Sequence, residues 1–176
     1  PSGRILSRDR LTTLLDGRAE GWTLVDEAYA DAHPDISLAR HISAHPKLIL
    51  FKSLGKFFGL AGLRLGFVIG PPEWIAKLRH HIGAWPVSSA AIAIGQAALR
   101  DSAWISESRA NLATRASALD HLIHSTGLIS SGDCHLFRRI ATANAHDLFH
   151  HLCAHGILPR PLADDPHHLR LGLPAD

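Results

Sequence analysis

Three short apolar runs constrain the fold of this chain more than any other feature of its sequence. They span residues 23–25, 48–51 and 63–69, and Gly62 and Gly70 bound the third. Continuous apolar runs of this length are typical of strands in a sheet that is covered on both faces. Polar residues that begin with Asp26 and Lys52 follow the first two runs directly. This pattern predicts a functional site at the strand ends.

Helical patterns alternate with these runs. Residues 8–16 place three leucines on one helical face, with Ser7 as the N-cap. Further helices are predicted from the first turn at Pro71 and Pro72 to about residue 81, and over residues 87–100 and 102–125. Gly127 is expected to close the last of them. The pattern predicts an α/β fold with a mostly parallel sheet.

The pattern changes after Gly127. A strand is predicted over residues 135–141, a helix over 145–155, and strands over 157–161 and 169–173. This order predicts a small α+β domain that is reached through the long preceding helix. We place the domain boundary near residue 110, which divides the chain into residues 1–110 and 111–176.

Composition excludes several classes of function. The 176 residues carry a net charge of +2 without a basic stripe, so we expect no nucleic-acid partner. No apolar run reaches the roughly 18 residues of a membrane span, so we expect a cytoplasmic protein without a membrane partner. Cys134 and Cys153 form no disulfide framework. Adjacent histidines such as His80 and His81 point about 100° apart on a helix, and we predict no metal site.

The polar residues around the three apolar runs form a chemically specific set. It contains an amine at Lys56, a carboxylate at Asp26, and the donors Ser53 and Arg64. Gly59 and Gly62 lie between the donors and would let the backbone turn closely around a phosphate. Pyridoxal phosphate needs an amine for its Schiff base, an anion beside its ring nitrogen and donors for its phosphate. The sequence therefore predicts a pyridoxal-phosphate site.

Two segments carry a resemblance to a known family. Residues 25–29 read VDEAY, and residues 53–66 read SLGKFFGLAGLRLG. Together they resemble the fold-type-I pyridoxal-phosphate aminotransferases, whose fold is that of aspartate aminotransferase. Within that family they are most similar to the branch of histidinol-phosphate aminotransferase and threonine-phosphate decarboxylase. The resemblance implies that residues 1–110 are the C-terminal part of the large cofactor-binding domain.

The resemblance also implies a role for each residue of the set. Asp26 would pair with the ring nitrogen of pyridoxal 5'-phosphate, and Tyr29 would bond its ring hydroxyl. Ser53 and Arg64 would bind the phosphate, and Lys56 would form the Schiff base. Arg170, within the sequence LRLG, would grip the carboxylate of a small amino-acid phosphate substrate. Relatives are homodimers, so the resemblance also implies a homodimer.

Two departures from the family pattern stand out. Gly55 precedes the lysine where relatives usually carry a hydroxyl residue, which removes one expected phosphate contact. The chain contains no Met and begins with Pro1, Ser2 and Gly3, which resemble the end of a family segment that lies midway along the relatives. We therefore expect that the chain lacks the N-terminal half of the family fold.

Three functions stay open. The tail segments CHLFR, GILPRPL and LRLGLP resemble the threonine-phosphate decarboxylases of cobalamin biosynthesis. That resemblance implies a lyase that converts L-threonine O-3-phosphate to (R)-1-aminopropan-2-yl phosphate. The alternatives are a histidinol-phosphate aminotransferase or related class I/II aminotransferase, and a non-catalytic fragment that acts only by association.

Overall fold

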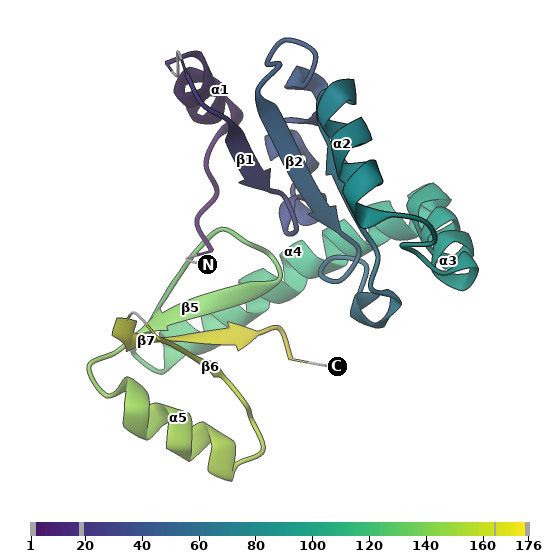
Figure 1. Cartoon of the computed structure of the whole chain (residues 1–176). Helices are drawn as coiled ribbons and strands as arrows, with labels where there is room; N and C mark the ends of the chain where they lie inside the picture. The colour runs from purple at the N-terminus through teal and green to yellow at the C-terminus, as the bar shows by residue number, and fades with distance from the viewer. Residues whose placement is uncertain (1–2, 18–19, 164, 175–176) are drawn as a thin grey trace. The chain divides into compact units, whose positions relative to one another are not determined.

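The computed structural model describes residues 3–17, 20–163 and 165–174 (Figure 1). It contains two compact units, each described by itself below. The N-terminal unit is Leu6–Ile105, and the C-terminal unit is Ser106–Asp176 together with Pro1–Ile5. The domain boundary near residue 110 stays a prediction, because compactness does not test whether each part folds alone.

A three-stranded sheet organises the N-terminal unit. Its strands are β1 (Thr23–Asp26), β2 (Leu48–Ser53) and β3 (Gly66–Ile69), in the order β1-β2-β3. β1 runs parallel to β2, and β2 runs antiparallel to β3. The segment between β1 and β2 contains three short 3-10 helices: η1 (Ala30–Ala32), η2 (Pro34–Ile36) and η3 (Ala39–His41). The predicted α/β class is confirmed.

The predicted helices of this unit are confirmed. They are α1 (Arg8–Asp16), α2 (Pro72–Ile82) and α3 (Ser89–Arg100). The Ser7 side chain caps α1 by accepting a hydrogen bond from the N–H of Arg10. Leu38, Leu48 and Leu50 form the core of the unit. No helix in the described ranges is long and apolar enough to cross a bilayer.

Two sequence predictions about this sheet are wrong. The predicted strand over 63–69 begins only at Gly66, because η4 (Ala61–Leu63) and the left-handed Arg64 precede it. Cover on both faces is only partial within this unit: Ile49 of β2 is 3% exposed, but its neighbours on the same face are not buried. Leu24 is 62% exposed and Phe51 is 39% exposed, on the face opposite the leucine core. An apolar run does not reveal which of its alternating side chains the same chain will cover.

A four-stranded antiparallel sheet organises the C-terminal unit. Its strands are β4 (Ile129–Ser131), β5 (Phe137–Ala141), β6 (Arg160–Leu162) and β7 (Asp165–Gly172), in the order β4-β5-β7-β6. The helix α5 (Ala145–Ala154) matches its prediction, and so does α4 (Ser102–Ser125), which Gly127 follows with a φ of 78°. β4 was not predicted, because two of its three residues are serines.

An ion pair joins α4 to the C-terminal sheet. Arg138 is 6% exposed, and its Nε donates to both carboxylate oxygens of Asp120 at 2.8 Å. Its Nη1 donates to the carbonyl of Cys134 at 2.7 Å. Burial by itself would raise the pKa of Asp120, but hydrogen bonds from Ser130 and Arg138 lower it overall. The guanidinium of Arg138 is therefore buried only because Asp120 compensates it.

We expect Asp120→Ala to lower the free energy of unfolding by about 2 kcal/mol at neutral pH, because Arg138 would be left buried without its anion. A carboxylate whose pKa is depressed in the fold stabilises above its unfolded pKa, and this contribution is lost as pH falls through the folded pKa. Urea denaturation at several pH values measures both effects. Asp147→Ala, at an 85% exposed side chain, is the matched control.

Candidate functional site

The parallel pairing of β1 and β2 places the predicted strand-end residues at one edge of the sheet. Asp26 lies opposite Phe51, and Ser53 follows two residues later at the end of β2. Asp26 is exposed, and its Oδ1 accepts a hydrogen bond of 2.9 Å from the N–H of Ala28. This bond turns the chain sharply as it leaves β1. The carboxylate therefore lies where the chain leaves the sheet.

A pocket of about 270 Å³ lies in the connection between β2 and β3. It brings together three of the predicted residues, and its lining is Ser53, Gly55, Lys56, Leu60, Ala61, Arg64, Leu65 and Gly66. The predicted glycines Gly59 and Gly62 are not in this lining. Gly55 and Gly66 take their place. The spacing of residues alone could not show which glycines the turn of η4 would bring to the pocket.

Gly55 has a steric reason to be glycine. A Cβ atom added there would lie 3.2 Å from Ser53 Oγ and 3.3 Å from Ala61 Cα. Contacts of that length are tighter than ordinary packing, so the neighbouring backbone would have to move. The N–H of Gly55 donates to Ser53 Oγ at 3.0 Å. Gly55, which stands where relatives usually carry a hydroxyl residue, therefore lies where two sides of the pocket approach each other closely.

Arg64 has a left-handed backbone, with φ at 52° and ψ at 38°. This conformation costs a residue with a side chain roughly 1–2 kcal/mol. The residue is exposed, and its Nη1 lies 3.5 Å from the carbonyl oxygen of Ala61. A cation held at the rim of a pocket on strained backbone is a recurrent feature of ligand sites.

Lys56 and Tyr29 lie together although 27 positions separate them in the sequence. The Nζ atom of Lys56 is 5.5 Å from the centroid of the Tyr29 ring. Lys56 is exposed and Tyr29 is half-buried at the start of η1. The segment that follows Asp26 thus reaches the lysine of the pocket. An amine, a phenol and a pocket with a cation therefore lie in one unit.

Glu27 is a polar residue of this region that was not singled out from the sequence. It is 4% exposed and accepts hydrogen bonds from Ser37 and Leu38. Its position directly after Asp26 gave no signal, because burial of a charge cannot be predicted from a single polar residue.

The C-terminal unit contains Arg170 in a row of arginines. On β7 it lies directly opposite Arg139 of β5 and Arg160 of β6. Its guanidinium carbon is 4.7 Å from the ring centroid of Phe137. Within the described part of the chain, its Nη1 is buried without a hydrogen-bond acceptor. Arg160 was not predicted, because it lies ten residues from Arg170 and only strand pairing joins the two.

Asp165 compensates one arginine of this row. It forms an ion pair with Arg139, and it accepts a hydrogen bond of 2.7 Å from His168 Nδ1. The hydrogen bond from His168 is the largest cause that holds the pKa of Asp165 below its usual value. The row therefore contains more cationic charge than its neighbouring carboxylate neutralises.

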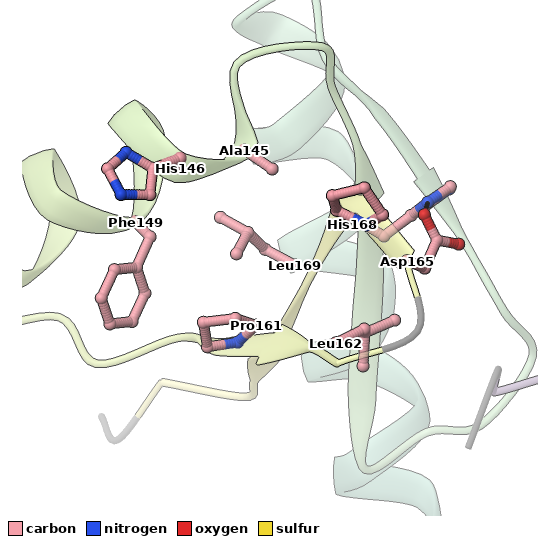
Figure 2. Close-up of a pocket in the computed structure, with 9 residues that line it drawn as sticks. Ala145, His146, Phe149, Pro161, Leu162, Asp165, His168 and Leu169 are labelled. Atoms are coloured by element: carbon pink, nitrogen blue, oxygen red, sulfur yellow. Dashed lines mark hydrogen bonds and ion pairs between the residues drawn. The ribbon is translucent and has the colours of Figure 1, made fainter.

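A second pocket, of about 170 Å³, lies between α5 and the strands β6 and β7 (Figure 2). Its wall is largely apolar, with Phe149, Pro161 and Leu169 among the labelled side chains. None of the predicted site residues lines it. It lacks the grouped amine, hydroxyl and guanidinium of the first pocket.

The family model for aminotransferase class I and II matches residues 1–175. A threonine-phosphate decarboxylase of Pseudomonas aeruginosa is 40% identical over 159 residues, which are 90% of this chain and 47% of that protein. A threonine-phosphate decarboxylase of a Sinorhizobium species is 37% identical over 179 residues, which cover 100% of this chain and 53% of that protein. The chain thus spans about half the length of these relatives.

A solved structure shows the same fold. The histidinol-phosphate aminotransferase of Sinorhizobium meliloti, in complex with pyridoxal-5'-phosphate, superposes with a TM-score of 0.87 at 23% identity. The match covers 100% of this chain and 50% of that one. Pro1 and Ser2, part of the segment that suggested a missing N-terminal half, lie outside the described residues. The chain belongs to the class I and II aminotransferase family.

Proposed function

We propose that this chain is part of a pyridoxal-phosphate-dependent decarboxylase of L-threonine O-3-phosphate, with (R)-1-aminopropan-2-yl phosphate as the product. The observation that carries the proposal is the pocket that groups Ser53, Lys56 and Arg64. The two decarboxylase relatives support the choice of reaction, since each is matched over nearly all of this chain. The small-molecule substrate and a homodimeric assembly belong to the same proposal.

The residues present fit the cofactor. A phosphate dianion needs a cation and hydrogen-bond donors, which Arg64 and the Ser53 hydroxyl supply at one pocket. The crowding that a Cβ would meet at Gly55 shows that the backbone closes tightly beside Ser53. Lys56 lines the same pocket and supplies an amine beside the ring of Tyr29. We assign Ser53 and Arg64 to the phosphate and Lys56 to the covalent bond.

The cofactor, when bound, supplies a protonated ring that accepts electrons from a bond at the substrate Cα. We assign to the exposed carboxylate of Asp26 the task of keeping the proton on the ring nitrogen by charge attraction. Tyr29 would bond the ring hydroxyl. In the reaction the bond between Cα and the carboxylate breaks and a proton replaces it. We assign the return of that proton to the amine of Lys56.

The surroundings of Arg170 favour the proposal that the substrate is an anion. Its buried Nη1 lacks an acceptor among the described residues, and leaving a charged donor so placed is costly. Arg160 lies directly opposite it, and like charges that face each other across strands destabilise a sheet unless an anion lies between them. A substrate with a carboxylate and a phosphate supplies such anions. We assign the substrate carboxylate to Arg170.

Two other functions make different predictions. A histidinol-phosphate aminotransferase would use the same lysine, aspartate and phosphate anchors, and the structural match to such an enzyme shows the shared fold. A protein that acts only by association would not need the amine and cation that share the pocket. An aminotransferase would break the bond between Cα and hydrogen, whereas the decarboxylase breaks the bond between Cα and the carboxylate. A protein that acts only by association would show no turnover at all.

We expect the full-length protein to gain a visible absorption band when pyridoxal phosphate is added, and Lys56→Ala in that protein to abolish both the band and turnover. The reason is that the covalent bond requires an uncharged amine at the pocket. Absorbance spectroscopy measures the band. Lys47→Ala, at an exposed lysine outside the pocket lining, should keep it. A band that survives Lys56→Ala and disappears with Lys47→Ala would show that the assignment of the cofactor to Lys56 is wrong.

We expect the full-length enzyme to release carbon dioxide from L-threonine O-3-phosphate without any keto-acid acceptor. Arg170→Lys should raise KM on the order of tenfold, because a point charge replaces a planar fork that binds a carboxylate through two bonds. Trapping of carbon dioxide together with product analysis measures both effects. Glutamate-dependent amination of imidazole-acetol phosphate, without carbon dioxide from phosphothreonine, would instead identify an aminotransferase.

A pair of variants at Arg64 separates backbone strain from binding. Arg64→Ala and Arg64→Gly both remove the cation, so each should weaken cofactor phosphate binding by about tenfold or more. Only glycine adopts the left-handed φ without strain. We therefore expect Arg64→Gly to be more stable than Arg64→Ala by about 1 kcal/mol in urea denaturation. Equal stabilities would show that the strain at this position is not real.

A further inference from the structure

The buried carboxylate of Glu27 is held by donors from three directions. Its Oε1 accepts the N–H of Leu38 at 2.7 Å, and its Oε2 accepts the Ser37 hydroxyl at 2.7 Å. Lys52 Nζ lies 3.5 Å from the same Oε2. With 4% exposure, this charge is tolerable only because it is hydrogen-bonded and paired.

These bonds close a loop. Residues 27–38 leave the sheet after β1 and turn through η1 and η2. Glu27 begins the loop, while Ser37 and Leu38 end it, so a single side chain fixes both ends. Leu38 is fully buried in the core of the unit. The carboxylate therefore anchors the end of the loop at a residue of the leucine core.

Lys52 ties this loop to β2. Its Nζ is 2.9 Å from Asp31 Oδ1 in η1 and 3.5 Å from Glu27 Oε2. Lys52 immediately precedes Ser53 of the pocket. The N–H of Glu27 also donates to the carbonyl of Phe51 at 2.7 Å, which joins the same two segments through the backbone. The loop and the pocket strand thus share one ionic network.

The residues on either side of Glu27 are the ones assigned to the cofactor ring. Asp26 precedes it, and Tyr29 lies two residues later with its ring 5.5 Å from Lys56 Nζ. A displacement of the loop would move Asp26 and Tyr29 relative to Lys56, and displacements of about 1 Å near a reacting centre cost rate.

We propose that Glu27, paired with Lys52, is a positioning residue that sets Asp26 and Tyr29 against Lys56. The inference rests on the proposed function, because it assigns a task to residues that the proposed function places at the cofactor. Glu27 touches neither substrate nor cofactor in this scheme. It acts through the loop it closes.

Glu27→Gln tests the proposal, because it keeps the shape and one acceptor oxygen but removes the charge that pairs with Lys52. In the protein without cofactor, we expect backbone amides of residues 27–38 to exchange with deuterium about tenfold faster. With saturating cofactor, we expect kcat to fall about tenfold, the visible band to shift, and KM to stay within about twofold. Asp35→Asn makes the same charge change at an exposed residue of the same loop and should alter none of these readouts.

Lys52→Gln tests the network from the strand and serves where Glu27→Gln does not fold. It leaves the bonds of Glu27 to Ser37 and Leu38 in place but removes the cation that ties Glu27 and Asp31 to β2. Because the loop loses this tie, faster exchange and lower kcat are expected again. The double variant should lose less than the product of the two single losses, since both remove one interaction.

The outcomes separate the two levels of the account. A Glu27→Gln protein with a lower melting temperature but unchanged exchange, band and kcat would overturn the positioning role. An unmodified full-length protein that gains no visible band with pyridoxal phosphate would overturn the proposed function. Deuterium exchange in the cofactor-free protein would still decide whether Glu27 orders the loop.

Discussion

The parallel pairing of β1 with β2 is the contact on which the rest of the N-terminal unit depends. It brings the end of β1 beside the end of β2, so Asp26 and Ser53 leave the sheet at one edge. Strand β2 then leads into the pocket turn, while the segment after β1 returns toward it with Tyr29. Without this register, residues that are 27 positions apart would have no reason to meet. The buried carboxylate of Glu27 then holds the segment after β1 in place by accepting a hydrogen bond from Leu38.

The C-terminal unit shows how neighbouring arginines on one strand acquire different tasks. Arg138 faces α4, is buried, and is compensated by Asp120. Arg139 points to the other face of β5, where it lies opposite Arg170. Because alternate residues of a strand face opposite sides of a sheet, Arg138 packs against α4 while the next residue, Arg139, belongs to the row with Arg170. The unsatisfied Nη1 of Arg170 belongs to that row.

Much of this organisation can be predicted from the sequence, and the failures have physical causes. The helix over residues 102–125 follows from its length and apolar phase, and α4 has those bounds. The strand over 63–69 was too long, since η4 and the left-handed Arg64 depend on tertiary contacts that no local pattern contains. Glu27 and Arg160 were missed for a related reason. Burial of a charge and pairing across strands are both non-local, and neither leaves a mark in the nearby sequence.

The central claim is that Lys56 holds pyridoxal phosphate, and reductive trapping tests it most directly. Borohydride treatment of the protein with bound cofactor fixes the cofactor to its lysine, and peptide mass spectrometry then locates the modified residue. The chain contains four lysines, so the other three are internal controls: Lys47, Lys52 and Lys77. We expect stoichiometric modification of Lys56 alone. Modification of another lysine, or of several at similar low levels, would contradict it.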